Sequence, residues 1–328
     1  MTAINPLRLV RRLLSAERGV MLALVAISLS GLAGVAALVV DVGNLYETRR
    51  ELQSGVDAAA LAGASYLPDD PDRAVAAALE YASHNGVAIT EDDIELYSTY
   101  VPGDTIRVGS VRHVSYGLAR VLGLTGDDVT AQATAVVGTV SGSVGCKPWA
   151  LFPEDPLPFG TMVTLKYNPL GNQGGNFGPL AIDAPGANPY RTAVVHGAST
   201  RIYVGELVDT ETGNVAGPTK QGLDEMFGGD HTAFSDAVEM LDSGLMVIKT
   251  PDCPRIALIP LIHALPEGGK IAVEIVGFAC VFIVDYKYHG PTGGLTVDAY
   301  FLKVVDPDGT WGPMGEVDYG LRVPKLVQ

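Results

Sequence analysis

Residues Val20–Val40 read VMLALVAISLSGLAGVAALVV, an apolar run of 21 residues without a single charged side chain. As a helix, a run of this length would be about 32 Å long, close to the ~30 Å hydrocarbon core of a bilayer. No second run of this kind follows in the 328 residues of the chain. The sequence therefore predicts one transmembrane helix and contact with membrane lipid.

The charges on the two sides of this run are unequal. Residues 1–18 contain four arginines and one glutamate, Asp41 ends the run, and the whole chain has a formal net charge of −15. Because basic residues favour the cytoplasmic side of a membrane, we expect a cytoplasmic N-terminus and an extracytoplasmic bulk. The acidic bulk would repel phosphate, so nucleic acid is not an expected partner.

A cleaved secretory signal peptide is the alternative for this N-terminal region. The apolar part of a signal peptide usually has only about 7–15 residues. No clean small-x-small cleavage site follows Val40, and the sequence after it has a helical pattern rather than the pattern of a loop. We therefore expect an uncleaved anchor.

The helix is predicted to continue past the membrane, from about Arg18 to about Tyr66, which makes it roughly 70 Å long. No proline interrupts the sequence between Asp41 and Pro68. Apolar and small residues recur there at alternating spacings of four and three, a 3.5-residue seam of the coiled-coil kind. Apart from a break at Arg49, the seam consists of Leu38, Val42, Leu45, Leu52, Val56, Ala59 and Gly63.

Small residues crowd the end of this helix, where Leu52–Leu67 reads LQSGVDAAALAGASYL. They form rows at four-residue spacing, which lets a second backbone approach closely. Each glycine costs about 1 kcal/mol relative to alanine inside a helix, so the glycines indicate close packing rather than helix propensity alone. The packing partner is either the protein's own head or the helices of other proteins. The candidate packing residues are Gly55, Ala59, Gly63, Ala58 and Ala62.

Short periodic segments follow the predicted helix. Asp70–Gly86 is amphipathic and has a proline near its start, which predicts a second helix. Strand-like alternation marks Ile94–Tyr100, Thr105–His113 and Val129–Gly138, and Ser115–Leu124 is expected to form a short helix. These segments predict a small α/β unit directly after the stalk.

The chain changes character at Gly138–Gly145, whose sequence GTVSGSVG has the composition of a flexible linker. Beyond it, prolines and glycines separate short runs rich in valine, isoleucine, phenylalanine and tyrosine, which predicts a β-rich domain, sandwich or barrel-like. One helix is expected within it, at Thr219–Phe227. The predicted strands are Thr161–Tyr167, Thr192–Val195, Arg201–Val204, Arg255–Ile262, Ile271–Asp285 and Leu295–Val305.

The three cysteines lack the paired spacing of a zinc site or of a CxxC redox motif. If the bulk is extracytoplasmic, two of them could form a disulfide. Cys146 with Cys253 is the preferred pair, because each lies near a proline at an apparent element boundary. Three buried free thiols, with Cys280 as the third, are the alternative.

The segment Glu17–Ala64 resembles the N-terminal signature of the TadE/TadG-like Flp pilus-assembly proteins. The matching residues lie on both sides of the apolar run and along the emerging helix. They are Arg18-Gly19, Val40-Asp41-Val42-Gly43, Tyr46, Arg49, Leu52-Gln53 and Asp57–Ala64. With the following α/β unit included, the resemblance implies a small pilin-like head on a long N-terminal helix, anchored in the bacterial cytoplasmic membrane.

Two features of this family are missing from the sequence. TadG-type members often carry a von Willebrand A domain with a DxSxS metal site, but no DxSxS occurs here. Pilin-type processing expects a glutamate five positions after a glycine, whereas Leu24 has that place after Gly19.

Four later phrases resemble a domain that follows the anchor in a subset of the family: Lys147–Leu151, Gly174–Asp183, Thr212–Phe227 and Pro254–Ile262.

Motifs of catalytic sites are absent from the sequence. It contains no GxSxG, no HExxH and no P-loop GK[ST], and the glycine-rich GNQGGNFG lacks the lysine of a phosphate-binding loop. His196 near Ser199 is a common coincidence in a loop, and Asp306–Glu316 lacks the ligand spacing of a calcium loop. We therefore expect no enzyme activity, no cofactor and no metal site.

The whole sequence predicts an α+β protein in five parts. They are a basic cytoplasmic segment (1–18), a transmembrane and stalk helix (19–67), a pilin-like α/β head (68–140), a linker (141–146) and a β-rich extracytoplasmic domain (147–328). The expected function is a structural or assembly component of a Tad/Flp-type pilus or secretion apparatus. Its partners would be other pilin-like or Tad membrane proteins, reached through the stalk helix. The alternative is a cell-surface module that binds a glycan or substratum and is tethered by a Tad-like anchor.

Overall fold

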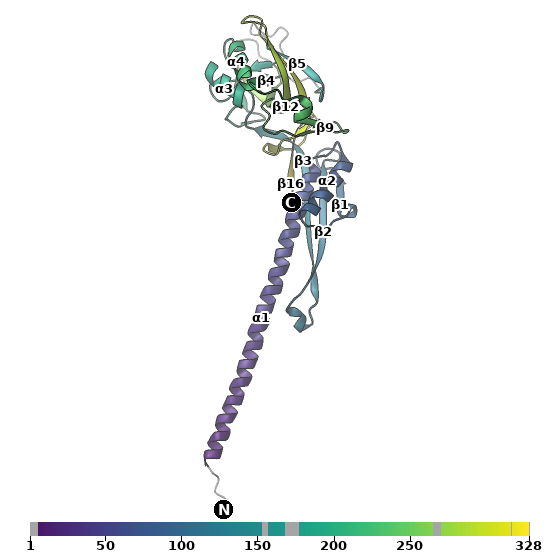
Figure 1. Cartoon of the computed structure of the whole chain (residues 1–328), viewed down its shortest axis with the longest axis vertical. Helices are drawn as coiled ribbons and strands as arrows, with labels where there is room; N and C mark the ends of the chain where they lie inside the picture. Colours follow the sequence, from purple (N-terminus) through teal and green to yellow (C-terminus); the bar gives the residue numbers. More distant parts are fainter. Residues whose placement is uncertain (1–5, 153–156, 168–176, 265–269, 316, 328) are drawn as a thin grey trace, which may run out of the picture.

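The computed structural model describes residues 6–152, 157–167, 177–264, 270–315 and 317–327. One long helix carries a head at its C-terminal end, and the head has a lower part beside the helix and an upper part beyond it (Figure 1). The helix, α1 (Pro6–Ala64), has 59 residues and is therefore about 88 Å long. It begins before the predicted start at Arg18 and ends close to the predicted end at Tyr66.

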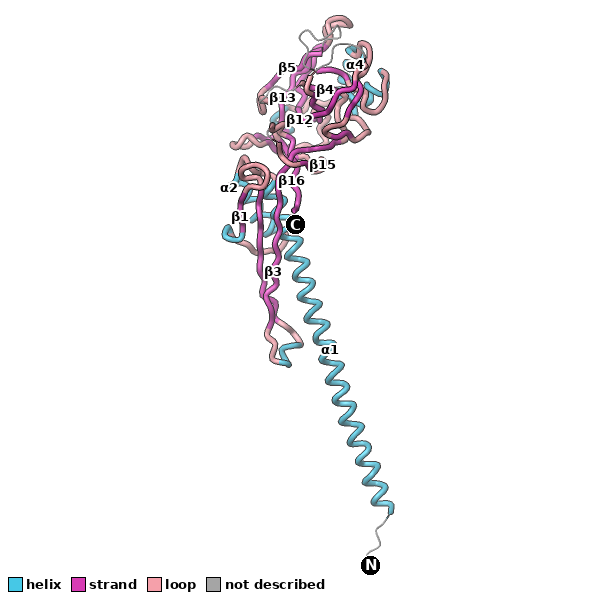
Figure 2. Tube along the Cα trace, turned by 180° about the vertical axis from the view of Figure 1, so that it is seen from behind, coloured by secondary structure: helices cyan, strands magenta, loops and turns pink. Residues whose placement is uncertain are grey.

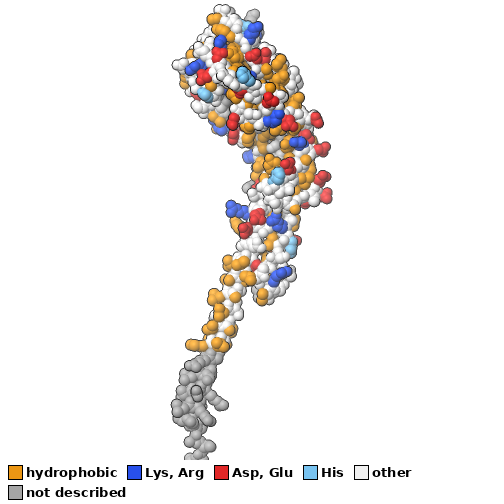
Figure 3. Space-filling model, viewed as in Figure 1, with side chains coloured by type: hydrophobic (Ala, Val, Ile, Leu, Met, Phe, Trp, Pro, Cys, Tyr) orange, Lys and Arg blue, Asp and Glu red, His pale blue; other side chains and the backbone are white. Residues whose placement is uncertain are grey.

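The N-terminal part of α1 has the surface of a membrane helix. Its most apolar window has a mean hydropathy of 2.4 and is only 6% buried, and no other helix in the described part of the chain is long and apolar enough to span a membrane. Apolar side chains cover the helix below the head (Figure 3). The predicted long apolar N-terminal helix is therefore confirmed.

The lower head begins with a short helix that packs on the end of α1. This helix, α2 (Pro71–His84), starts at Asp70, whose carboxylate accepts a hydrogen bond from the Arg73 N–H at 3.0 Å. Pro71 lacks a backbone N–H, and it fits at the first helical position because an N–H there would have no partner within the helix. The buried residues of α2 are the alanines Ala74, Ala77, Ala78 and Ala82, and these small side chains let the two helices lie close together.

An antiparallel sheet completes the lower head. Its elements are η1 (Glu91–Asp93), β1 (Ile94–Tyr97), β2 (Thr105–Ser115), η2 (Ala119–Leu122) and β3 (Gly126–Ser143). Strands β2 and β3 pair from Thr105 opposite Val136 to Ser115 opposite Gly126. This long hairpin runs alongside α1 toward its N-terminal end (Figure 2). The strands and the short helix that the sequence predicts are all present, with the helix reduced to one 3₁₀ turn.

Strand β3 continues through residues for which the composition predicts a flexible linker. The sequence GTVSGS, residues 138–143, belongs to β3 and is not a linker. A Cβ atom on Gly138 would lie 2.3 Å from the Trp311 indole nitrogen, and one on Gly142 would lie 2.4 Å from the Tyr203 ring. The two glycines therefore leave room for aromatic side chains to pack against the strand. The glycine content of this segment predicts flexibility instead.

The C-terminus of the chain returns to the sheet of the lower head. Among the described residues, β7 (Ile202–Tyr203), β15 (Thr310–Gly312) and β16 (Leu321–Val327) pair with β3 there, and β14 (Val304–Val305) pairs with β16. The main strand order is β1-β2-β3-β16-β14, in which β16 pairs antiparallel with β3. The predicted head and the predicted β-rich domain therefore share one sheet.

A second sheet forms the upper head. Its order is β5 (Met162–Tyr167), β13 (Leu295–Leu302), β12 (Ala272–Tyr288), β11 (Ile256–Ile262), β4 (Trp149–Leu151) and β6 (Phe177–Pro179), with β8 (Leu207–Asp209) on β12. A separate hairpin consists of β9 (Val238–Met240) and β10 (Met246–Ile248). The centre of this sheet is buried, since β12 has seven consecutive buried residues from Gly277 to Ile283 without alternation, as in a strand covered on both faces. The expected β-rich C-terminal region is confirmed.

The described residues of the upper head include the helices α3 (Ala187–His196), α4 (Ala216–Phe227) and α5 (Phe234–Ala237). The helix expected at Thr219–Phe227 is present and begins earlier, at Ala216. The strand expected at Thr192–Val195 is wrong, because those residues belong to α3. Tyr190, Ala193 and Val194 are buried at helical spacing against the upper core, and this contact outweighs the strand preference of two adjacent valines.

The cysteines are free thiols in the structure. Cys146, Cys253 and Cys280 are all buried in one apolar cluster beneath the second sheet. The structure therefore contains no Cys146–Cys253 disulfide. It has three buried free thiols, which is the alternative that the sequence left open. Burial raises the pKa of the Cys146 thiol to about 12.

Candidate functional site along the stalk helix

The helix α1 divides into two segments with different surroundings. We call residues 21–40, which are exposed except at Gly34 and Ala37, the bare segment and residues 52–64 the covered segment. Leu38 and Val42, at the start of the predicted seam, have exposed side chains, whereas Leu52, Val56 and Ala59 are buried. The seam is therefore covered only in its C-terminal part, and there the cover is the protein's own sheet and α2 rather than a second stalk helix.

The glycines of the covered segment permit close contact with the lower head. A Cβ atom on Gly55 would lie 2.2 Å from Val87 Cγ2, and one on Gly63 would lie 2.5 Å from Ile106 Cδ1 and 2.9 Å from the Ala74 carbonyl oxygen. No larger residue fits at either place without movement of its neighbours. Of the five candidate packing residues, Gly55, Ala59 and Gly63 are buried, and Ala58 and Ala62 are half-buried.

One polar residue of the sequence signature, Gln53, bonds the covered segment to the sheet, and a second, Asp57, accepts a hydrogen bond from it. The Gln53 amide donates to the Asp57 carboxylate at 2.8 Å and to the Gln132 carbonyl oxygen of β3 at 3.0 Å. Tyr46 and Arg49, which belong to the same signature, are exposed on α1. The signature therefore contains both residues that hold the head and residues that face away from it.

Asp41 connects the other end of the hairpin to α1. Its carboxylate accepts hydrogen bonds from the backbone N–H groups of Gly117, Leu118 and Ala119, at 2.8, 3.1 and 2.6 Å. Asp41 is buried although it follows directly on an apolar run. From the sequence, this aspartate only marks the end of the run; the structure adds that it holds the turn between β2 and β3. An isolated carboxylate at the exit of a membrane helix is the one sequence signal of this contact.

An ion-pair cluster joins the end of the stalk to the C-terminal strands. The Arg322 guanidinium, 2% exposed, contacts the carboxylates of Asp69 and Asp318 and donates to the Leu67 carbonyl oxygen at 3.0 Å. Lys303 pairs with the same two carboxylates at 2.9 and 3.2 Å. Burial opposes the ionisation of Asp318, but Arg322, the Gly320 N–H and the Lys303 charge together outweigh it and hold the pKa of Asp318 below its ordinary value.

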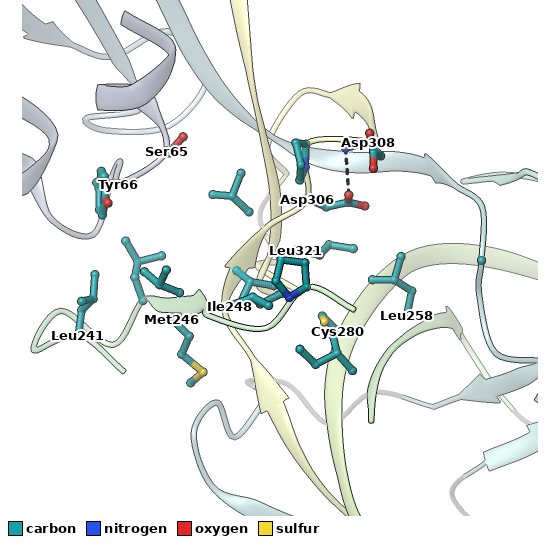
Figure 4. A pocket seen from close by; sticks show the side chains of 18 of the residues that line it. Ser65, Tyr66, Leu241, Met246, Ile248, Leu258, Cys280, Asp306, Asp308 and Leu321 are labelled. Carbon is teal, nitrogen blue, oxygen red and sulfur yellow. Dashed lines mark hydrogen bonds between the residues drawn. The ribbon is translucent and has the colours of Figure 1, made fainter. Parts of the chain in front are cut away.

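A cavity of about 660 Å³ lies where the end of α1, the β9–β10 hairpin and the C-terminal strands meet. Figure 4 shows Tyr66, Leu241 and Ile248 among its walls, and Asp306 with Asp308 at its edge. Burial raises the pKa of the Asp306 carboxyl. The walls come from segments far apart in the chain, so no sequence motif marks this cavity.

The residues considered for catalysis are not assembled into a catalytic group. The Ser199 hydroxyl donates to the Asp183 carboxylate at 3.1 Å, and His196 ends α3. Within the ranges that the structure covers, no cluster of three or more His, Cys, Asp or Glu residues could hold a metal ion. The segment GNQGGNFG lies mostly outside the described residues.

Lys147 is buried, which lowers its pKa to about 8, and its ammonium donates to the Val195 carbonyl oxygen at 3.0 Å.

Comparison with known proteins identifies the stalk. Residues 19–65 match the family model described as "Putative Flp pilus-assembly TadE/G-like". No curated protein and no solved structure matches the chain. The match begins at Gly19 and ends just after the covered segment, so it includes Asp41 and the glycines that pack against the head. The apolar run and the helix that continues it into the head are therefore similar to the TadE/G-like Flp pilus-assembly family.

Proposed function

We propose that this protein is a membrane-anchored, pilin-like structural component of a Tad/Flp-type pilus or secretion apparatus. The observation that carries the proposal is the coincidence of the family match with one continuous helix, which is bare over residues 21–40 and covered by the head over residues 52–64. A helix of this form can anchor in the bacterial cytoplasmic membrane and hold the head at a fixed distance from it. The role is structural rather than enzymatic.

The bare segment is the surface that we assign to partner helices. A Cβ atom on Gly31 or Gly34 would meet nothing within 4 Å, so both positions are open to a second helix. Gly34 and Ser30 lie four residues apart, a spacing at which membrane helices pack closely. The excess of arginine before the run supports a cytoplasmic N-terminus and an extracytoplasmic head.

Deletion and complementation in the native host test this proposal. A deletion strain should lack assembled pili in electron micrographs, and the wild-type gene should restore them. A variant in which an unrelated transmembrane helix of equal length replaces Val20–Val40 should reach the membrane fraction but restore few pili. A conservative control, Ile27→Val, leaves the helix surface almost unchanged and should restore wild-type pili.

Normal pili in the deletion strain would contradict the proposal. If that strain instead failed to attach to a surface or glycan that the purified protein binds, the tethered binding module would be the better account. Restoration of pili by the exchanged helix would limit the assembly role to the head and would remove the bare segment as a partner surface.

A further inference from the structure

The turn between β2 and β3 is the part of the head that reaches furthest along α1. We call residues 116–125 the hairpin tip. Figures 1 and 2 show it beside α1, well below the rest of the head and on the side of the N-terminus. The unbroken pairing of β2 with β3 up to Ser115 and Gly126 holds the tip there as a fixed extension of the sheet.

The hairpin tip exposes large apolar side chains. Leu118 is 49% exposed, Val121 is 89% exposed and Leu124 is 50% exposed, so about half or more of each residue lies open in the described structure. Arg120 is exposed beside them and Tyr116 is half-buried. Aliphatic residues together with a tyrosine and an arginine are typical of segments at a membrane interface, where the apolar parts enter lipid and the polar ends reach the headgroups.

The contacts of the tip fix its depth relative to the apolar run. Asp41, which holds Gly117 and Ala119, is the first residue after that run. Ala37, one turn closer to the bilayer centre on the same face of α1, is only 8% exposed, whereas Leu38 beside it is 56% exposed. Because α1 contacts η2 at this level, the tip lies at the edge of the hydrocarbon core that the run would span.

We propose that the hairpin tip inserts Leu118, Val121 and Leu124 into the membrane leaflet at which α1 leaves the bilayer. This inference rests on the proposed anchoring by residues 20–40. The tip then gives the head a second contact with lipid beside the transmembrane helix, with Asp41 as the positioning residue. Two contacts with lipid instead of one restrict the tilt of α1 and the head relative to the membrane.

Fluorescence of variants that each carry one introduced cysteine, in lipid vesicles, tests the depth of the tip. The full chain is reconstituted into vesicles of phosphatidylcholine and phosphatidylglycerol and labelled with nitrobenzoxadiazole at Val121→Cys. Leu29→Cys, in the middle of the apolar run, reports the anchor, and Val111→Cys, exposed on β2, reports a site outside the membrane. The three native cysteines are buried, and unmodified protein serves as the labelling control.

The expected result is quenching at Val121→Cys by lipids with a nitroxide near the headgroup, and quenching at Leu29→Cys by lipids with a nitroxide deep in the chain. Val111→Cys should be quenched by neither. In addition, Asp41→Ala should remove most of the quenching at Val121→Cys and leave Leu29→Cys unchanged, while Asp41→Asn, which keeps one acceptor oxygen, should retain part of it.

Each other outcome overturns one defined statement. If Leu29→Cys is quenched but Val121→Cys behaves like Val111→Cys, the tip proposal is wrong and the anchor stands. If Leu29→Cys is not quenched, the anchor fails and the tip proposal fails with it. Emission at Val121→Cys that rises with protein density and resists lipid quenchers would mean that the tip contacts a second copy of the chain, which also overturns insertion.

Discussion

The bare and covered segments of α1 carry small residues at the same four-residue spacing but have different neighbours. In the covered segment, a Cβ atom on Gly55 or Gly63 would come within 2.5 Å of another side chain, whereas at Gly31 and Gly34 it would meet nothing within 4 Å. The same pattern therefore has two meanings in one helix. In water it admits the protein's own head, and in lipid it leaves a surface on which another helix can pack.

The two segments differ because different parts of the chain lie beside them. Beyond Asp41 the sequence provides apolar strands and an alanine-rich helix, and these bury the seam in one cluster with α1. Along the apolar run, the described segment that reaches α1 is the hairpin tip. The comparison predicts that changes in the covered segment alter folding of the head, whereas changes in the bare segment alter contacts with lipid or other proteins.

The largest loss of stability is expected from Arg322→Met. This change removes the contacts of Arg322 with Leu67 and Asp69, which follow the covered segment. The change leaves Asp69 and Asp318 with Lys303 as their remaining cationic partner in this cluster, and the loss of one partner from a buried ion pair typically costs about 3–5 kcal/mol. Urea unfolding of the full chain in detergent micelles, followed by tryptophan fluorescence, should show a loss of this order.

The matched control for Arg322 is Arg107→Met. Arg107 pairs with Glu95 at 3.1 Å on the surface, and an exposed pair contributes only about 0.2–1 kcal/mol. Equal losses in the two variants would show that the cluster beneath the upper head does not secure the end of the stalk.

The second effect compares Gly63→Leu with Gly34→Leu. Leucine at Gly63 would collide with Ile106 and with the Ala74 carbonyl oxygen, and such overpacking costs about 1–3 kcal/mol. Leucine at Gly34 has free space, so the free energy of unfolding of the head should not fall. Similar losses at both positions, measured by the same urea unfolding, would contradict the division of α1 into two segments.

Local patterns in the sequence were sufficient for most of the lower head. Hydrophobic spacing and the absence of proline predict α1, while alternation predicts β1, β2 and β3. The apolar run needs no tertiary partner to be recognised, because its length alone fits a bilayer. The choice between the two packing partners of Gly55 and Gly63 could not be made in this way, since the spacing is the same for a sheet, a helix of the same chain or a helix of another protein.

Long-range contacts account for what the sequence did not predict. Gly138 and Gly142 have the composition of a linker, but Trp311 and Tyr203 from distant segments pack on them and keep β3 extended. Val194 and Val195 prefer a strand but lie in α3, whose buried face consists of Tyr190, Ala193 and Val194. Asp41 acquires its role only when a turn 76 residues later in the chain is placed beside it.

A smaller effect is expected from acid, which should loosen the cover of α1 while leaving the bare segment helical. The Asp104 carboxylate in the turn before β2 accepts hydrogen bonds from the N–H groups of Thr99, Tyr100 and Val101. Burial opposes its ionisation, but the backbone donors and the Thr105 hydroxyl together outweigh burial and hold the pKa of Asp104 below its ordinary value.

A lowered pKa in the folded state means that Asp104 stabilises the head above its ordinary pKa of 3.8, and that this contribution is lost as the pH falls through the lowered value. Asp104→Asn should therefore cost about 1–3 kcal/mol at neutral pH and progressively less below about pH 4. Unfolding curves of both proteins between neutral pH and acid measure this. A difference that stays constant with pH would show that the charge of Asp104 does not support the turn.

The smallest effect tests the closest approach in the covered segment. In Gly55→Ala the new methyl group would lie 2.2 Å from Val87 Cγ2, a side chain at the end of a short loop that can move slightly. Alanine also gains about 1 kcal/mol of helix propensity over glycine, so the net loss should be below about 1 kcal/mol. Gly31→Ala, which gains the same propensity in open space, is the control.

The double variant Gly55→Ala with Val87→Ala separates these two contributions. If the new methyl group collides with Val87, the two changes should couple by at least about 0.5 kcal/mol, because removal of the valine methyls makes room for the alanine. Additive losses, with Gly55→Ala as favourable as Gly31→Ala, would mean that the helix and the head do not need a glycine there. The contrast between the two segments would then depend on Gly63 and the apolar seam rather than on the whole glycine row.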